Sequence, residues 1–283
     1  MDRGITFWLL AALGGLVVYG LFLLKRKLQA RRRSRLTAQP FPPRWEEILQ
    51  GNLSLYRYLP TDFKTALQND IKIFLDEKRF EGAGGLVMTD EIRITIAGEA
   101  CILLLNNENR LYPGLLSIVV YPGAYVIPQV EPVGDGIYLE GEETLEGESW
   151  SQGTLVLSWD DVKRDALRFG DGHNVVIHEF AHQLDQEDGR ADGAPRFGKG
   201  SRSRDWARVL GAKYEELRED AERGREAVLD YYGASDPAEF FAVATEAFFD
   251  NPVGLRERDP ELYDELEWYF NVDPASWVAG PRS

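Results

Sequence analysis

The chain has 283 residues, and its hydrophobic content of 44% and aromatic content of 12% predict a folded protein rather than a disordered one. Its single cysteine, Cys101, excludes an intrachain disulfide and any metal site built from several thiolates. Residues 1–35 contain eight basic side chains and one acidic side chain, whereas the rest of the chain contains 24 basic and 46 acidic ones. Because so acidic a domain is repelled by phosphate groups, we do not expect it to bind nucleic acid.

The first predicted element is the uncharged run of 20 residues from Ile5 to Leu24. A helix of that length spans about 30 Å, the thickness of the hydrocarbon core of a bilayer. A buried core helix would normally have a polar face, and a cleaved signal peptide would have its basic residues before the apolar run. Residues 1–24 are therefore predicted to form a retained N-terminal transmembrane anchor.

Basic residues follow the apolar run directly, as Lys25-Arg26-Lys27 and Arg31-Arg32-Arg33. The positive-inside rule places this end of the helix in the cytoplasm. The same basic residues should lie against anionic lipid headgroups, which makes the lipid bilayer a predicted partner. We expect a single-pass protein whose main domain is cytoplasmic.

Residues 25–44 are predicted to be a basic linker bounded by prolines, and residues 45–283 a single domain. Apolar residues at helical spacing predict a helix over Thr61–Arg79. Thr89 is suited to cap a helix running towards Leu105, although alternating isoleucines in that segment also fit a strand. Four runs rich in β-branched and aromatic residues follow. These runs are Leu115–Tyr121, Ala124–Gln129, Ile137–Glu140 and Thr154–Trp159.

The chain after Asp160 is predicted to be helical. The expected helices are a short one that ends at Phe169, one around His178, and then Arg204–Arg223, Pro237–Asp250 and Pro260–Phe270. Strands followed by helices indicate an α+β domain with a small mixed sheet and C-terminal helices.

The sequence His178-Glu179-Phe180-Ala181-His182 has the pattern of a zinc site. Four residues separate the two histidines, so a helix places both imidazoles on one face about one turn apart. Zn²⁺ accepts imidazole ligands, and catalytic sites typically use three protein ligands and a water. Glu179 is placed to act on that water as the general base. A chance match on a surface helix is the alternative, but apolar flanking residues indicate a buried helix, in which unpartnered imidazoles would be costly.

Spacing alone leaves the third metal ligand open. Glu239 and Glu246 lie on the predicted helix Pro237–Asp250, and Asp185 lies one turn beyond His182. Asp185 is better suited to orient a histidine or to cap the helix. Glu239 follows Asp236-Pro237, a cap with proline at the first helical position, and is therefore held rigidly. Glu246 fits either an exposed glutamate or a group that orients a ligand.

Two segments of the chain resemble the Mlc titration factor A family, a bacterial family of zinc-dependent peptidases. The segments are His178-Glu-Phe-Ala-His-Gln-Leu-Asp185 and Tyr231-Tyr-Gly-Ala-Ser-Asp-Pro-Ala-Glu-Phe-Phe-Ala242, and Gly153–Asp161 is also typical of the family. The catalytic domain of anthrax lethal factor has a similar pair of motifs. The resemblance covers roughly residues 40–275 and implies a zincin-like fold.

The resemblance implies that Glu239 is the third zinc ligand beside His178 and His182, and that Tyr232 faces the active site. Tyr232 would donate a hydrogen bond to the oxyanion of the tetrahedral intermediate. A core aromatic residue is the alternative for Tyr232. His173, in the turn before the motif, is expected to be a turn residue or to support a ligand. Family members are soluble, so the predicted anchor is a departure from the family.

Two functions follow from these predictions. The first is a zinc metallopeptidase at the inner face of the bacterial inner membrane, which hydrolyses peptide or protein substrates in an endopeptidase or aminopeptidase-like mode. Its substrate would lie along the strand around Thr154–Trp159. The second is a regulatory binding protein that captures a cytoplasmic transcriptional regulator, as the resembled family does, with cleavage secondary.

Overall fold

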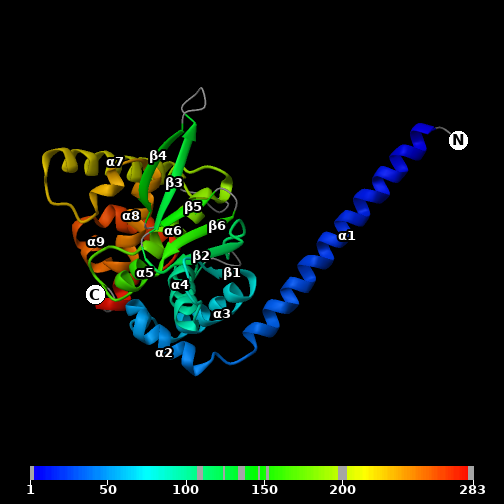
Figure 1. The fold of residues 1–283 in the computed structure, drawn as a ribbon, viewed down its shortest axis with the longest axis horizontal. Coiled ribbons are helices and arrows are strands. Elements are labelled where there is room, and N and C mark those ends of the chain that lie inside the picture. The colour runs from blue at the N-terminus through cyan, green and yellow to red at the C-terminus, as the bar shows by residue number, and fades with distance from the viewer. Residues whose placement is uncertain are drawn as a thin grey trace. The chain divides into compact units, whose positions relative to one another are not determined.

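The structure is a computed structural model of the chain. It describes the backbone of residues 3–106, 111–123, 125–132, 138–145, 147–150, 153–196 and 203–279, and the side chains of residues 13–106, 111–123, 153–196 and 203–279. The chain divides into two units, residues 1–41 and residues 42–283. Figure 1 shows the helices and strands of these units.

The first unit is built on one long helix, α1 (Arg3–Thr37). The basic residues predicted to form a linker continue this helix, because arginine and lysine are good helix formers and proline first appears at Pro40. Among the residues described, no helix is both long enough and apolar enough to cross a membrane. The side chains of residues 5–12, which begin the predicted anchor, lie outside the described part.

The second unit is mainly helical. Its helices are α2 (Pro43–Asn52), α3 (Thr61–Glu77), α4 (Asp90–Ile102), α5 (Trp159–Ala166), α6 (Val175–Asp185), α7 (Ser203–Arg223), α8 (Pro237–Asp250), α9 (Pro252–Arg258), α10 (Pro260–Phe270) and α11 (Pro274–Ala279). The segment after Thr89 is a helix rather than a strand, and the Thr89 side chain caps it by accepting a hydrogen bond from the Ile92 N–H. The predicted bounds of α8 and α10 are confirmed, since a proline begins each helix.

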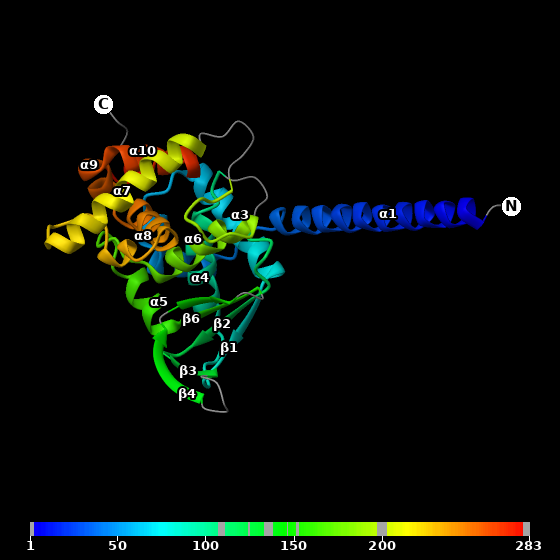
Figure 2. The same cartoon turned by 90° about the horizontal axis from the view of Figure 1, so that it is seen from above.

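A four-stranded mixed sheet has the order β1 (Arg79–Gly82), β2 (Ser117–Tyr121), β6 (Thr154–Ser158) and β5 (Gly147–Trp150). The first three strands are parallel, and β5 pairs with β6 in the antiparallel direction. Helices α3, α4 and α6 lie to one side of this sheet (Figure 2). Together these elements confirm the predicted α+β class.

The pairing of β6 corrects one prediction. Strand β6 was expected to bind an extended substrate, but it pairs with β2 on one side and with β5 on the other. A strand whose hydrogen-bonding groups are used on both sides cannot accept a further strand. The two remaining predicted strands form a separate antiparallel hairpin, β3 (Tyr125–Pro132) and β4 (Tyr138–Leu145). Residues Ala124 and Ile137 of those predictions lie outside the described part.

The core positions the helix that carries the histidine motif. Helix α6 contacts α8, α4 and β5, which places it between the sheet and the C-terminal helices. Phe180 of α6 is fully buried, with its ring 4.7 Å from that of Tyr112 and 5.8 Å from that of Phe74, measured between centroids. Burying aromatic rings of this size contributes on the order of several kcal/mol to the free energy of unfolding. The metal motif therefore lies on a rigid element.

Candidate metal centre

Helix α6 begins at a residue that connects it to two other helices. The Asn174 side chain caps the helix by accepting a hydrogen bond from the Ile177 N–H at 2.9 Å. Its Nδ2 donates to Glu99 Oε1 of α4 at 2.8 Å, and its backbone N–H donates to Glu246 Oε2 of α8 at 2.6 Å. These bonds fix both the position and the direction of the helix that presents His178.

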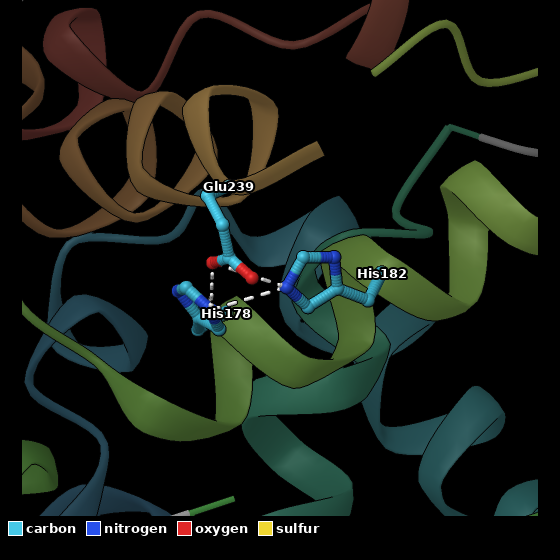
Figure 3. A group of neighbouring side chains, drawn as sticks. All are labelled: His178, His182 and Glu239. Carbon is cyan, nitrogen blue, oxygen red and sulfur yellow. Dashed lines mark hydrogen bonds and ion pairs between the residues drawn. The ribbon is translucent and has the colours of Figure 1, made fainter. Parts of the chain in front are cut away.

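The two histidines of α6 and one glutamate of α8 point toward one another (Figure 3). His178 Nε2 and His182 Nε2 are 3.1 Å apart. Glu239 Oε2 lies 3.0 Å from the first nitrogen and 3.4 Å from the second. Among the histidine, cysteine, aspartate and glutamate side chains that the structure describes, these three have ligand atoms close enough to share a cation.

The geometry of these three residues fits a zinc ion. Ligand atoms at such separations match the corners of a tetrahedron whose centre is about 2 Å from each, as in zinc sites with histidine and carboxylate ligands. Two histidines and one carboxylate also leave a fourth position for water or substrate. The side chains of His178, His182 and Glu239 are 14%, 12% and 19% exposed, so the site is open to solvent on one side.

Glu239 is held at the beginning of α8. The Asp236 carboxylate caps the helix by accepting hydrogen bonds from the N–H groups of Ala238 and Glu239, at 2.8 and 3.0 Å. Pro237 occupies the first helical position, where it removes no helical hydrogen bond. The local sequence Asp-Pro-Ala-Glu thus fixes the backbone that carries the third side chain of the group.

Glu246 supports His178 from the opposite side. Glu246 Oε1 lies 2.7 Å from His178 Nδ1, so the ring nitrogen that faces away from the group donates to a carboxylate. Such a bond fixes the tautomer and leaves Nε2 free to bind a metal. Glu246 is only 4% exposed. Of the two roles left open for Glu246, the structure therefore favours the orienting group over the exposed glutamate.

Charge in the site depends on these contacts. Burial lowers the pKa of His178, but its bonds to Glu239 and Glu246 outweigh burial and raise the pKa to about 10. Burial works to raise the pKa of Glu239, but the two histidines outweigh it and lower the pKa to about 2. Without a cation, His178 thus holds a proton beside an ionised Glu239. Since a metal binds neutral imidazole, its binding releases that proton.

Glu179 is buried next to the group. It is 5% exposed, and its Oε2 has no hydrogen-bond partner among the residues that the structure describes. Burial raises the pKa of this carboxyl group to about 7, although the two histidines act to lower it. A carboxylate that titrates near neutrality is suited to accept and return a proton. An unpaired buried oxygen is also consistent with a polar ligand at this position.

Tyr232 lies beside the histidines on a short 3-10 helix, η3 (Tyr231–Ala234). Its ring centroid is 5.9 Å from that of His178, and its side chain is 57% exposed. The alternative of a core aromatic residue is therefore wrong. Tyr231 is also exposed, and its hydroxyl donates to the Arg225 carbonyl.

Asp185 has a role in the loop after α6. It is fully buried, and its Oδ2 accepts a hydrogen bond from the Gly193 N–H at 2.9 Å. Gly193 has φ +72°, and a Cβ atom at this residue would lie 2.2 Å from the Pro237 carbonyl oxygen. The loop therefore passes against the first residue of α8, and glycine is required there. Asp185 holds this loop in place beside the helix that carries Glu239.

Sequence reasoning missed three of these supporting residues. Asn174 precedes the apolar run of α6 and could have been recognised as an N-cap. Asp230 precedes Tyr231-Tyr232-Gly233, where an acidic residue commonly begins a turn, and it accepts a hydrogen bond from the Tyr232 N–H at 2.7 Å. Glu99 has no such local signal, because its partner Asn174 is distant in the sequence.

Comparison with known proteins agrees with this geometry. The model of the glucose-regulated metallo-peptidase M90 family matches residues 27–271. The chain belongs to this family. It is therefore a member of a metallopeptidase family, and His178, His182 and Glu239 lie within the matched region.

Three relatives illustrate how far the similarity extends. Protein slr2042 of Synechocystis sp. is 39% identical over 245 residues, which cover 86% of this chain and 89% of the relative. Mlc titration factor A of Pectobacterium atrosepticum is 33% identical over 207 residues, covering 71% and 76%. Mlc titration factor A of Escherichia fergusonii is 30% identical over 245 residues, covering 86% and 91%. The predicted resemblance to the Mlc titration factor A family is confirmed.

Proposed function

We propose that this protein is a zinc-dependent peptidase that hydrolyses peptide bonds in peptide or protein substrates. The observation that supports it best is the convergence of His178 Nε2, His182 Nε2 and Glu239 Oε2 next to the buried carboxyl group of Glu179. Membership of a metallopeptidase family supports the same reaction class.

Each residue of the site has a specific task in this proposal. His178, His182 and Glu239 hold the zinc ion, which, when bound, lowers the pKa of a water molecule and polarises the substrate carbonyl. Glu179 accepts a proton from the attacking water and returns it to the leaving amine. Tyr232 donates a hydrogen bond to the oxyanion of the tetrahedral intermediate. Glu246 keeps His178 in the tautomer and orientation that the site needs.

The test combines metal content and turnover of the purified full-length protein. We expect about one zinc ion per chain, hydrolysis of members of a peptide panel, loss of hydrolysis on chelation and recovery with added zinc. In Glu179→Gln, zinc content should stay the same while turnover falls by a factor of about 10² to 10⁴, the usual contribution of a general base.

The matched control is Glu222→Gln, at an exposed position of α7. This variant should keep both zinc and turnover. Peptide hydrolysis that survives unchanged in Glu179→Gln, or that resists complete zinc removal, would overturn the proposed mechanism.

The name of the relatives supports a second candidate function. Several are called Mlc titration factor A, which associates those proteins with Mlc. We propose that this chain can also capture a transcriptional regulator of that kind, and that capture does not require cleavage. Glu179→Gln should then bind the regulator as tightly as the unchanged protein. Loss of binding in that variant would contradict capture as an activity separate from hydrolysis.

We also propose that residues 1–24 anchor the protein in the bacterial inner membrane with the peptidase domain in the cytoplasm. Support comes from the large apolar side chains of α1 that are exposed between Leu13 and Leu24 and from the basic residues that follow them. Protease added to intact spheroplasts should leave the domain uncut, and lysis should expose it. Digestion from outside would overturn the orientation, and recovery of the protein in the soluble fraction would overturn the anchor.

A further inference from the structure

His173 stands between two acidic groups beside the metal-binding residues. Its Nε2 lies 3.0 Å from Asp230 Oδ2, and its Nδ1 lies 3.8 Å from Glu246 Oε2. The first distance is a hydrogen bond and the second an ion pair. The His173 side chain is 56% exposed, so these contacts, rather than burial in the core, determine where the ring lies. The ring therefore bridges the segment that contains Asp230 and helix α8, which contains Glu246.

The backbone that presents His173 is itself fixed. Residues 170–173 form the turn before α6, in which Gly170 and Gly172 both have positive φ angles. The N–H groups of these two glycines donate to Asp250 Oδ2, at 3.0 and 2.8 Å, and Asp250 is the last residue of α8. The His173 N–H donates to Asp171 Oδ1 at 3.1 Å. These hydrogen bonds fix the backbone position from which the His173 side chain extends.

Asp230 connects His173 to the backbone of Tyr232. The Asp230 carboxylate caps the short helix η3: its Oδ1 accepts from the Tyr232 N–H at 2.7 Å, while its Oδ2 bonds to His173. Within η3, the Gly233 N–H donates to the Asp230 carbonyl at 3.1 Å. Gly233 is buried against Val243 of α8. The supports of Tyr232 therefore include the packing of Gly233, the orientation of the Asp230 side chain, and Ser235, whose Oγ donates to the Tyr232 carbonyl at 2.6 Å.

The two neighbouring carboxylates favour the protonated, charged form of the His173 ring. Burial lowers the pKa of His173, but the carboxylates of Glu246 and Asp230 outweigh this and raise it above its ordinary value. A protonated ring donates a charge-assisted hydrogen bond to Asp230 and is also attracted to Glu246, which fixes the ring more firmly than one neutral hydrogen bond would. Glu246 in turn bonds to His178, so the bridge starts from the carboxylate that orients one of the metal-binding histidines.

We propose that His173 is a positioning residue for Tyr232. His173 holds the Asp230 side chain in the orientation that keeps the tyrosine beside His178. This inference rests on the proposed function, because it gives Tyr232 a place in the reaction. His173 makes its side-chain hydrogen bond and ion pair with Asp230 and Glu246 rather than with His178, His182 or Glu239. It acts through Asp230 and the backbone of η3.

Hydrogen exchange of the full-length protein tests the structural part without any activity. The variants are His173→Ala, which removes the ring, and His173→Gln, whose side-chain amide keeps a donor within reach of Asp230. In His173→Ala, the amides of residues 231–235 should exchange about five- to tenfold faster, the effect of losing one hydrogen bond of ordinary strength, because both side chains are partly exposed. His173→Gln should restore most of the protection, and exchange in α6 should be unchanged in both variants.

Kinetics test the functional part. In His173→Ala, kcat for peptide hydrolysis should fall by about tenfold while KM and zinc affinity stay the same, because a transition-state contact is lost without loss of ground-state binding. Combining His173→Ala with Tyr232→Phe should cost little more than Tyr232→Phe alone, since both act on one group. Additive losses would show that His173 acts elsewhere and would overturn the proposal.

The two measurements separate this inference from the proposed function. Unchanged exchange of residues 231–235 in His173→Ala, in a protein that binds zinc and hydrolyses peptides, overturns the positioning role alone. In another outcome, the unchanged protein hydrolyses no peptide while exchange is still faster in His173→Ala. That result supports the contact through Asp230 and overturns the proposed hydrolysis. Equal exchange in His173→Ala and His173→Gln, both faster than in the unchanged protein, would overturn the role assigned to the bond with Asp230.

Discussion

Glu246 Oε1 lies 2.7 Å from His178 Nδ1, which connects α8 to the ring nitrogen opposite the one that lies beside Glu239 and His182. Glu246 also accepts from the backbone N–H of Asn174, the residue that caps α6. One carboxylate therefore controls both the beginning of the helix and the orientation of the first histidine on it.

The first prediction concerns Glu246→Gln. An amide is a weaker acceptor for the His178 N–H than a carboxylate, and it does not favour the tautomer that presents Nε2 to a metal. Zinc affinity, measured by competition with a chromophoric chelator, should fall by a factor of about 10 to 100. Glu265→Gln, at a buried glutamate of α10, is the control and should keep its affinity. Equal affinities in the two variants would contradict the orienting role.

The second prediction concerns the neighbouring tyrosines of η3. Tyr232→Phe removes a hydroxyl group and keeps the ring, so kcat should fall by a factor of about 10² to 10³ while KM and zinc affinity are unchanged. Tyr231→Phe is matched to it in chemistry and position, but the Tyr231 hydroxyl donates to the Arg225 carbonyl. Steady-state kinetics on one peptide substrate should separate the two variants. Similar losses in both would show that the hydroxyl of Tyr232 has no special part in the reaction.

The third prediction compares two glycines with positive φ angles. A methyl group at Gly193 would lie 2.2 Å from the Pro237 carbonyl oxygen, whereas one at Gly189 would meet nothing within 4 Å. Both substitutions by alanine cost about 1 kcal/mol for the left-handed backbone. Gly193→Ala should cost at least about 2 kcal/mol more in the free energy of unfolding, because backbone atoms of α8 must move. Urea unfolding of both variants measures the difference, and equal losses would show that the loop yields freely.

The fourth prediction is a pH dependence of stability. Burial raises the pKa of Glu99 to about 8, although Asn174 acts to lower it. Between the unfolded value, near 4.5, and about 8, the folded protein holds a proton that the unfolded chain has released. The contribution of Glu99 to the free energy of unfolding is therefore full below pH 4.5 and is lost as the pH rises towards 8. The loss is on the order of a few kcal/mol.

Glu99→Gln replaces the protonated carboxyl group by a neutral amide of the same shape. Urea unfolding with chelator present should show this variant to be more stable than the unchanged protein at pH 8 and less dependent on pH. Some slope should remain, because burial also raises the pKa of Asp250, to about 7. Glu47→Gln, at an exposed position of α2, should keep the full slope. An unaltered slope in Glu99→Gln would contradict the assignment.

Local sequence signals predicted the elements that carry the site. The spacing of His178 and His182 placed both on one helical face, and Asp236-Pro237 fixed where α8 begins. These signals are strong because they depend on residues within one turn of each other. Glu239 and Glu246, two turns apart on α8, could have been predicted to share a face.

Long-range relationships could not be predicted in the same way. The order of strands in the sheet depends on which chains pair, and no residue within β6 indicates that both of its edges are used. Strands β1 and β5 have four residues each, too few for a clear alternation of apolar and polar positions. The contact between His173 and Asp230 joins segments distant in the sequence, which come together because both the turn before α6 and η3 pack against α8.

The three candidate ligand atoms come from α6 and α8, and the whole of α7 lies between these helices in the sequence. A zinc ion bound by both helices, as we propose, links distant parts of the chain as a removable cross-link. Zinc at a hundred times its dissociation constant would favour the folded state by about 2.7 kcal/mol. Because cellular proteases degrade unfolded chains, the amount of this protein in a cell should then follow the zinc supply, independently of any substrate.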